Sequence, residues 1–264
     1  MNPDIEVRTY FARHRNALVA RAGFSELFAA WYLHRMDCGI QLPPECDNNG
    51  RDALAALTLH CAGRPWKETC AWTVHMCEPR MNIFAAGDNA TGTVVANVFN
   101  ENVREIKKGV FYSDVVEEGH PSRRSVTEFE GSDFLKAVGQ FYAKSEQRPA
   151  RFFWDGDEDM VMVAAQPDCD LEWLHSLDAA AIATLDADVE LALLEKRLYR
   201  FECGCTQDRM LDFLRPVFRK QGDELFEGEE TIRIHCPRCG ARHVITRESL
   251  EAHVKSENPP AGSA

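Results

Sequence analysis

The sequence contains no long apolar segment. None of its stretches approaches the roughly 20 consecutive apolar residues that a membrane-spanning helix requires. Its first 25 residues carry charges at Glu6, Arg8, Arg13 and Arg15, and they show neither the apolar core nor the cleavage signature of a secretory signal. We therefore expect a cytoplasmic protein that does not associate with a membrane.

Positive charge is also scarce. The 30 Lys and Arg residues are outnumbered by 42 Asp and Glu residues, which gives a formal net charge of −12. Residues 201–256 contribute only −1 of this charge, and the rest of the chain contributes −11. Because nucleic-acid binding depends on Lys and Arg side chains that neutralise phosphates, this balance argues against a nucleic-acid partner. We interpret the acidic surface as a solvated one.

The sequence also lacks the common signatures of enzymes. No Ser-His-Asp arrangement, glycine-rich phosphate loop or pair of carboxylates at a meaningful spacing stands out. We therefore expect a protein that is not an enzyme.

Two close pairs of cysteines toward the C-terminal end form the strongest motif. Cys203 and Cys205 flank one residue, Cys236 and Cys239 flank two, and 30 residues separate the pairs. Two ligands so close in sequence lie on one tight turn and can bind the same ion, so the two pairs predict a tetrahedral zinc site with four thiolates. Predicted strands at residues 231–235 and 242–246 flank the second pair, and Thr206 is placed to cap a helix after the first. The expected cofactor is one zinc ion in the reduced protein.

The chemistry of this predicted site leaves two uses open. Zinc keeps its sulfur ligands deprotonated and oxidisable at neutral pH, and structural zinc contributes about 10–16 kcal/mol to the folding of small modules, so oxidation would unfold the module. The alternative is a constitutive zinc ribbon with a purely structural ion, in an interaction or nucleic-acid-binding protein. Four thiolates leave no open position for catalysis by the ion or for His235 and His243 as ligands. A thiol oxidoreductase would require a metal-free Cys-x-x-Cys.

Six further cysteines lie outside this motif: Cys38, Cys46, Cys61, Cys70, Cys77 and Cys169. Three of them lie near His60 and His75, which makes that segment a candidate for a second metal site. Its apolar neighbours instead predict that these cysteines pack as small hydrophobic side chains in the core.

Hydrophobic periodicity predicts an α+β fold, with a mixed helix and antiparallel-sheet domain first. Turn-forming residues predict a loop over residues 42–50, Ser132 is placed to cap a helix, and Pro216 is expected to bend the helix after Thr206. The predicted helices cover residues 24–31, 53–59, 134–142, 171–177 and 179–198, and the predicted strands of the first domain cover residues 72–76, 82–86, 93–99, 151–154 and 160–164.

These elements predict four regions. The chain would consist of an N-terminal α+β domain (residues 1–170), a helical linker (171–200), a small C-terminal zinc-binding module (201–256) and a disordered tail (257–264).

The motifs resemble those of a known family, the redox-regulated holdase chaperones of the HslO type, or thirty-three-kilodalton heat-shock proteins. The resemblance rests on the two cysteine pairs with their spacer, on residues 141–152 with the segment Ser145-Glu146-Gln147-Arg148-Pro149-Ala150-Arg151, and on the order of the regions. It covers the chain from about Phe111 onward. Within the second motif, we expect Glu146 and Arg151 to form a buried ion pair.

The resemblance implies a function. Cys203, Cys205, Cys236 and Cys239 would bind zinc in a reduced, inactive form, and oxidants would join Cys203 to Cys205 and Cys236 to Cys239. Loss of zinc would then uncover surfaces that hold unfolded or partly folded client proteins without ATP. Activated members of the family associate as dimers, so a homodimer is expected in the oxidised state.

Overall fold

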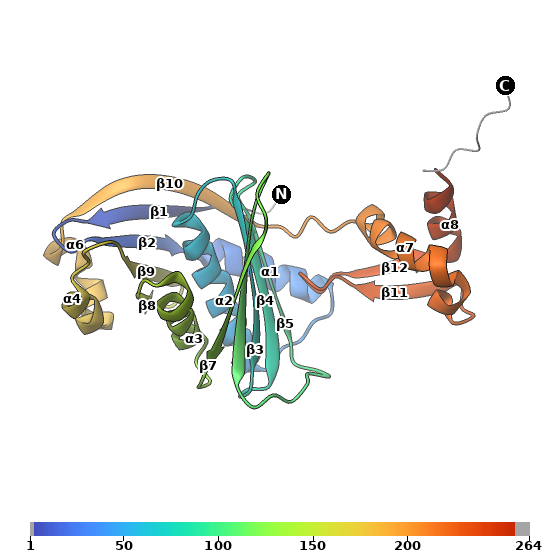
Figure 1. The fold of residues 1–264 in the computed structure, drawn as a ribbon, viewed down its shortest axis with the longest axis horizontal. Coiled ribbons are helices and arrows are strands. Elements are labelled where there is room, and N and C mark those ends of the chain that lie inside the picture. Colours follow the sequence, from blue (N-terminus) through green and yellow to red (C-terminus); the bar gives the residue numbers. More distant parts are fainter. Residues whose placement is uncertain (1–2, 257–264) are drawn as a thin grey trace, which may run out of the picture. The chain divides into compact units, whose positions relative to one another are not determined.

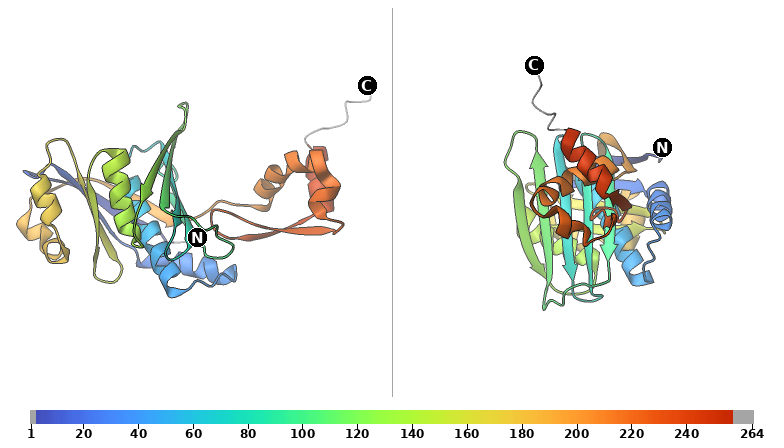
Figure 2. Two further views of the ribbon diagram at one scale, coloured as in Figure 1. Left: turned by 60° about the horizontal axis from the view of Figure 1, so that its bottom comes forward. Right: turned by 90° about the vertical axis from the view of Figure 1, so that its right-hand side faces the viewer.

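The computed structural model describes residues 3–256, and these residues form two compact units that divide between Cys203 and Gly204 (Figures 1 and 2). The boundary between the units falls inside the first cysteine pair. Within the described part of the chain, no helix is both long enough and apolar enough to cross a membrane. The predicted disordered tail lies outside the described residues.

The first unit is built around a large sheet. Its strands are β1 (Ile5–Ala12), β2 (Ala17–Gly23), β3 (Glu68–Met76), β4 (Met81–Asp88), β5 (Thr93–Phe99), β6 (Gly109–Glu117), β7 (Arg123–Phe129), β8 (Ala150–Asp155), β9 (Asp159–Ala165) and β10 (Leu191–Phe201). Its helices are α1 (Ser25–Asp37), α2 (Pro44–Ala62), α3 (Phe134–Phe141), the π-helical turn η1 (Tyr142–Glu146), α4 (Leu171–Ser176), α5 (Ala179–Ala183) and α6 (Leu185–Asp188).

The second unit is a small mixed module. It contains α7 (Gln207–Phe226), the antiparallel pair β11 (Thr231–His235) and β12 (Arg242–Thr246), and α8 (Arg247–Ser256). The predicted strands on either side of the second cysteine pair are confirmed. The side chain of Thr206 accepts a hydrogen bond from the amide of Arg209, which confirms it as the N-cap of α7.

Strand β10 joins the two halves of the large sheet. The strand order is β7-β6-β3-β4-β5-β10-β1-β2-β9-β8, and β10 lies antiparallel to β1 and parallel to β5 (Figure 1). The contact with β1 runs along the whole of that strand, whereas only Arg200 and Phe201 are in register with β5. The mixed α+β fold is therefore organised by a strand that comes late in the chain.

Helix α2 packs on the buried face of the β3-β4-β5 meander. Strand β3 alternates strictly between buried and half-buried positions, as expected for a strand with one face on a core. The ring of Trp72 on this face lies 5.0 Å from the ring of His60 on α2. The side chain of Trp31 on α1 donates a hydrogen bond to the carbonyl of Ala96 on β5, which ties a second helix to the meander.

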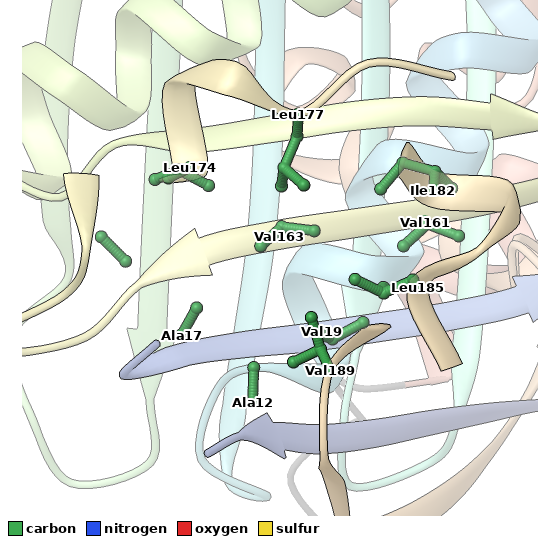
Figure 3. Close-up of a cluster of buried hydrophobic side chains, with 11 residues drawn as sticks. Ala12, Ala17, Val19, Val161, Val163, Leu174, Leu177, Ile182, Leu185 and Val189 are labelled. Carbon is green, nitrogen blue, oxygen red and sulfur yellow. The ribbon is translucent and has the colours of Figure 1, made fainter. Parts of the chain in front are cut away.

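A separate apolar cluster fills the space between the other half of the sheet and the short helices α4, α5 and α6 (Figure 3). Leu174, Leu177, Ile182 and Leu185 pack there against Val163 on β9 and its neighbours. The buried members on the strands and the connecting segment are Ala12, Ala17, Val19, Val161, Ala165 and Val189. Residues 171–189 are therefore part of the first unit's core.

The predicted helix over residues 179–198 is wrong in its second half. Helices α5 and α6 are short, and residues from Leu191 onward form β10 instead. The segment from Leu191 to Leu198 is rich in leucine and suits both a helical and an extended pattern, so periodicity alone does not decide its state. Pairing with β1 decides it. Without β10, the edge of β1 that does not pair with β2 would leave a row of backbone donors and acceptors without partners.

The N-terminal third also differs from expectation. Strands β1 and β2 precede the helices, and the predicted loop over residues 42–50 is largely helical, because α2 begins at Pro44. Proline suits the first helical turn, where an amide hydrogen has no intrahelical acceptor. The four turn-forming residues from Asp47 to Gly50 lie within this helix. The predicted strands of the meander and of the β8-β9 hairpin are confirmed.

Two details of the helices concern their caps and their interior. Asp133, not Ser132, caps α3. Helix α7 contains Pro216, and the residue inside it with a non-helical backbone is Gln221, so the bend at Pro216 stays a prediction.

The predicted ion pair between Glu146 and Arg151 does not form. Glu146 pairs with Arg64 at 2.9 Å, and Arg151 donates hydrogen bonds to the backbone carbonyls of Leu174, His175 and Leu177. Arg151 therefore holds the end of α4 on the β8-β9 hairpin.

The Tyr142→Phe variant tests the buried polar contact between η1 and α2. The Tyr142 hydroxyl lies 2.6 Å from Nδ1 of His60, and both side chains are fully buried. Removing the hydroxyl leaves the imidazole nitrogen buried without its partner, so we expect the free energy of unfolding to fall by about 1–3 kcal/mol in urea titrations. The matched control is Tyr32→Phe, where the side chain is half exposed, and it should change little. Equal effects in the two variants would contradict this.

The Asp52→Asn variant tests a partly buried carboxyl group. Burial raises the pKa of Asp52 from 3.8 to about 6, although its carboxylate accepts a hydrogen bond from the indole of Trp154. Because the folded state binds this proton more tightly than the unfolded state, Asp52 should cost stability as the pH rises from about 4 through 6. Asparagine keeps the acceptor without the charge. We therefore expect Asp52→Asn to stabilise the protein at pH 7, by up to about 3 kcal/mol, and to have less effect at pH 4. A difference from wild type that does not change with pH would contradict this.

Candidate metal centre

The first cysteine pair lies on the segment between β10 and α7. Strand β10 ends at Phe201, two residues before Cys203, and α7 begins two residues after Cys205. Gly204 adopts a φ of +65°, a left-handed conformation that other residues rarely adopt, and it lets the chain turn between the two sulfurs. The Gly204 carbonyl accepts a hydrogen bond from the guanidinium of Arg209 at 2.8 Å, so α7 fixes this turn.

The second pair lies on the turn between β11 and β12. The amide of Cys236 donates to the carbonyl of Ala241, and the amide of Gly240 donates back to the carbonyl of Cys236, each at 2.8 Å. Gly240 has a φ of +76°, which closes this turn directly after Cys239. The turn therefore presents both sulfurs from one rigid loop.

The two turns bring all four sulfurs together. The Sγ atoms of Cys203, Cys205, Cys236 and Cys239 lie within 4.8 Å of one another. Among the described residues, these four cysteines form the group of side chains that could bind a metal ion. The sulfurs of Cys205 and Cys239 are 3.6 Å apart. This separation is close to the ~3.8 Å edge of a zinc tetrahedron with ~2.3 Å bonds, and it is much longer than a ~2.05 Å disulfide bond. The four cysteines could therefore hold one metal ion, and the donor set suits zinc.

The two pairs differ in their exposure. Cys236 and Cys239 are buried, with 2% and 1% of their surfaces exposed, whereas Cys203 and Cys205 are partly exposed. A small oxidant in solution would therefore meet the first pair before the second.

The module around the sulfurs has a small apolar core. Its buried members come from α7, β12 and α8, and they are Met210, Leu211, Phe226, Ile245 and Leu250. Cys205 packs against this cluster, so the position of the sulfurs and the packing of the core are linked. A core of this size is too small to stabilise a domain by itself, which makes a metal ion the natural second source of folding free energy.

The other candidates from the sequence do not join this group. The four-sulfur cluster of the described residues does not include His235 or His243. Cys61 and Cys70 are fully buried in the first unit, which agrees with the prediction of core packing, and no metal-ligating group of three forms around them in residues 3–256. Cys77 is partly exposed and donates to the carbonyl of Ile106.

Comparison with known proteins shows which family the chain resembles. Residues 162–246 match the family model described as Hsp33 protein. The chain is 26% identical over 195 residues to the 33 kDa chaperonin of Edwardsiella ictaluri, which covers 63% of each chain. It is 25% identical over 162 residues to the 33 kDa chaperonin of Pectobacterium carotovorum, covering 51% of this chain and 56% of that protein. The chain thus spans less than two thirds of the length of these relatives.

A solved structure shares the fold. The crystal structure of the 33 kDa chaperonin (heat shock protein 33 homologue) from Thermotoga maritima matches with a TM-score of 0.70 and 14% identity, over 96% of this chain and 99% of the other. The fold is therefore that of the 33 kDa chaperonins. The matching family model and the related sequences show that this chain is similar to the Hsp33 family, with the family model covering residues 162–246.

The Cys236→Ser variant tests the four-ligand assignment. Loss of one buried thiolate should lower the zinc content well below one ion per chain and make residues 204–256 sensitive to proteolysis, because the small core alone does not hold the module. The first unit should stay folded. Zinc analysis and limited proteolysis measure both effects.

The matched control is Cys169→Ser, a partly exposed cysteine of the first unit, which should keep its zinc and its protease-resistant C-terminal end. A Cys236→Ser protein with full zinc content and an intact C-terminal module would refute the assignment.

Proposed function

We propose that this protein is a redox-regulated holdase, which binds unfolding proteins without ATP after its four-cysteine zinc centre is oxidised. The observation that carries the proposal is the convergence of four sulfurs in a module whose core is too small to fold well without a metal. Similarity to the Hsp33 family supports it, since the curated relatives are named chaperonins.

The first step of the proposal is oxidation of the thiolates. When bound, zinc keeps the four sulfurs deprotonated and therefore reactive toward peroxide. The pairs Cys203-Cys205 and Cys236-Cys239 would each lose two electrons and form a disulfide, while one peroxide molecule per disulfide takes up two protons from the solvent and is reduced to two waters. The partial exposure of Cys203 and Cys205 favours attack at the first pair. The short ring closed by Cys203 and Cys205 would be strained, which favours its later reduction.

The second step is unfolding of the module. Disulfides are poor metal ligands, so their formation removes the contribution of the ion to folding, and the core around Phe226 and Ile245 would open. Helix α7 already exposes Phe213, with 74% of its surface accessible, and Val217. Met210 and Leu211 on the same helix would join them and form an apolar surface of the kind that binds unfolded chains.

The end of β10 links the first cysteine pair to the sheet of the first unit. The amide of Glu202 donates to the carbonyl of Val94 on β5, and the next residue is Cys203. Release of Cys203 from the metal would free the chain end that this hydrogen bond holds. In this proposal residues 201–256 act as the switch, and residues 171–200, which join the switch to the chaperone-like domain, transmit its state through β10 rather than through a helical linker.

The proposed partners follow from the same chemistry. Unfolded or partly folded proteins would be the clients, and a homodimer would form in the oxidised state. The net charge of −12 argues against the alternative of a constitutive nucleic-acid-binding zinc ribbon. We place the protein in the cytoplasm, where thiols remain reduced until an oxidant appears.

A client-aggregation assay tests the proposed function. We expect the reduced, zinc-loaded protein to have little effect on the light scattering of a thermally unfolding client. Peroxide at mild heat should produce suppression in step with zinc release, and a dithiol reductant with zinc should reverse both.

The Cys236→Ser variant serves as a second test, because its module is expected to be open without oxidation and should suppress aggregation constitutively. Release of zinc without suppression would show that the centre is structural and that the holdase proposal is wrong.

A further inference from the structure

The end of α2 brings a second pair of thiols together inside the first unit. Cys61 lies on the last turn of α2, and Cys70 lies on β3, beside that helix (Figure 1). Cys70 shares a face of β3 with Trp72, because side chains two residues apart on a strand point the same way. The Trp72 ring contacts His60, the neighbour of Cys61, so this face is turned toward α2. Both thiols are fully buried.

Gly87 shows how close the two sulfurs lie. Gly87 on β4 is the residue directly opposite Cys70 in the β3-β4 ladder. A Cβ atom at residue 87 would lie only 2.6 Å from Sγ of Cys61, so the Cys61 thiol occupies the space that a side chain would fill. The Cβ positions of residues opposite each other in a ladder are about 4.5–5.5 Å apart. The Cys61 sulfur therefore lies beside Cys70.

The surroundings of this pair favour one thiolate. Hydrogen bonding from Cys61 lowers the pKa of Cys70, against the opposing effect of burial, and His60 and Arg64 lower it further. The same contact with Cys70, together with burial, raises the pKa of Cys61. The Nε2 atom of His60 is buried and has no hydrogen-bond partner among residues 3–256, while Nδ1 is engaged by Tyr142. A polarised thiol pair beside an imidazole and a guanidinium is typical of reactive cysteines.

We propose that Cys61 and Cys70 are a second redox site, which small hydroperoxides oxidise to a disulfide within the first unit. The Cys70 thiolate attacks the peroxide oxygen and, with one proton taken up, gives Cys70 sulfenic acid and water. The Cys61 thiol then attacks the Cys70 sulfur, a sulfur-sulfur bond forms, and the sulfenic oxygen leaves as a second water. Two thiols are oxidised, and one peroxide is reduced to two waters. Burial makes the reaction depend on brief local opening, so it is slower than oxidation of the partly exposed Cys203 and Cys205.

The disulfide would strengthen a junction that already holds much of the unit together. The Cys61 carbonyl accepts hydrogen bonds from the side chains of Asn89 and Arg197, which belong to the β4-β5 connection and to β10. A bond from Cys61 to Cys70 closes the short connection between α2 and β3 and removes freedom from the unfolded chain. Oxidation would thus stabilise the first unit under the conditions that unfold the zinc module. The inference does not rest on the holdase proposal.

Thiol mapping of the full-length wild-type protein tests the inference directly. The protein is treated with hydrogen peroxide at mild heat, and after quenching its free thiols are alkylated in denaturant and its peptides are analysed by mass spectrometry. We expect a cross-linked peptide that joins Cys61 to Cys70 and lacks two hydrogen atoms, and we expect it to appear after zinc release. The control within the same sample is Cys46, a buried cysteine of α2, which should remain alkylated. Recovery of both Cys61 and Cys70 as alkylated thiols after complete zinc release would overturn the proposal.

Two matched variants separate the roles of the thiols. In Cys61→Ala the resolving thiol is absent, so Cys70 should accumulate as a sulfenic acid that a cyclic diketone traps. In Cys70→Ala the Cys61 thiol should stay reduced, because it has lost the partner that reacts first. Trapping at Cys61 rather than Cys70 would reverse the assigned roles and contradict the mechanism. The aggregation assay reports on the zinc module, so its failure and the failure of this disulfide are measured independently.

Discussion

The structure of the first unit depends on the insertion of β10 between β5 and β1. Without this strand, the meander β7-β6-β3-β4-β5 and the group β1-β2-β9-β8 would be two separate sheets with exposed edges. The strand pairs with all of β1, reaches β5 only through its last residues, and runs almost directly into Cys203. Arg197 on β10 also donates to the carbonyls of Cys61 and Arg64, so the strand fixes the end of α2 as well. One element therefore joins the sheet halves, the helix over them and the chain that leads to the sulfurs.

The two units use cysteine in opposite ways because their cores differ in size. The first unit buries a large apolar core, and its fully buried thiols Cys61 and Cys70 can pack there without contributing the main stability. The C-terminal module has only a small buried cluster around Phe226 and Ile245. Its four sulfurs lie close together beside this small core. Oxidation would consequently have opposite effects at the two sites, since it would cross-link the first unit but remove the ion on which the proposed switch depends.

The sequence was most informative where a pattern had one physical solution. Two close cysteine pairs can meet only around a shared centre, and the alternating strands from Trp72 to Phe99 formed the predicted meander. It was least informative where long-range pairing decides the local state. The leucine-rich segment of β10 suits a helix as well as a strand, and its partner β1 lies almost 200 residues away in sequence. The contact between Cys61 and Cys70 was equally hidden, since it depends on α2 crossing β3 and on the absent side chain of Gly87.

In the proposed function, four thiolates hold one zinc ion around which the C-terminal module folds. X-ray absorption at the zinc edge, recorded on the purified reduced protein, measures the ligands of that ion most directly. We expect four sulfur neighbours at about 2.3 Å and no nitrogen or oxygen neighbour in the same shell. Fewer than four sulfurs, or a mixed shell with imidazole nitrogen from a residue such as His243, would contradict it.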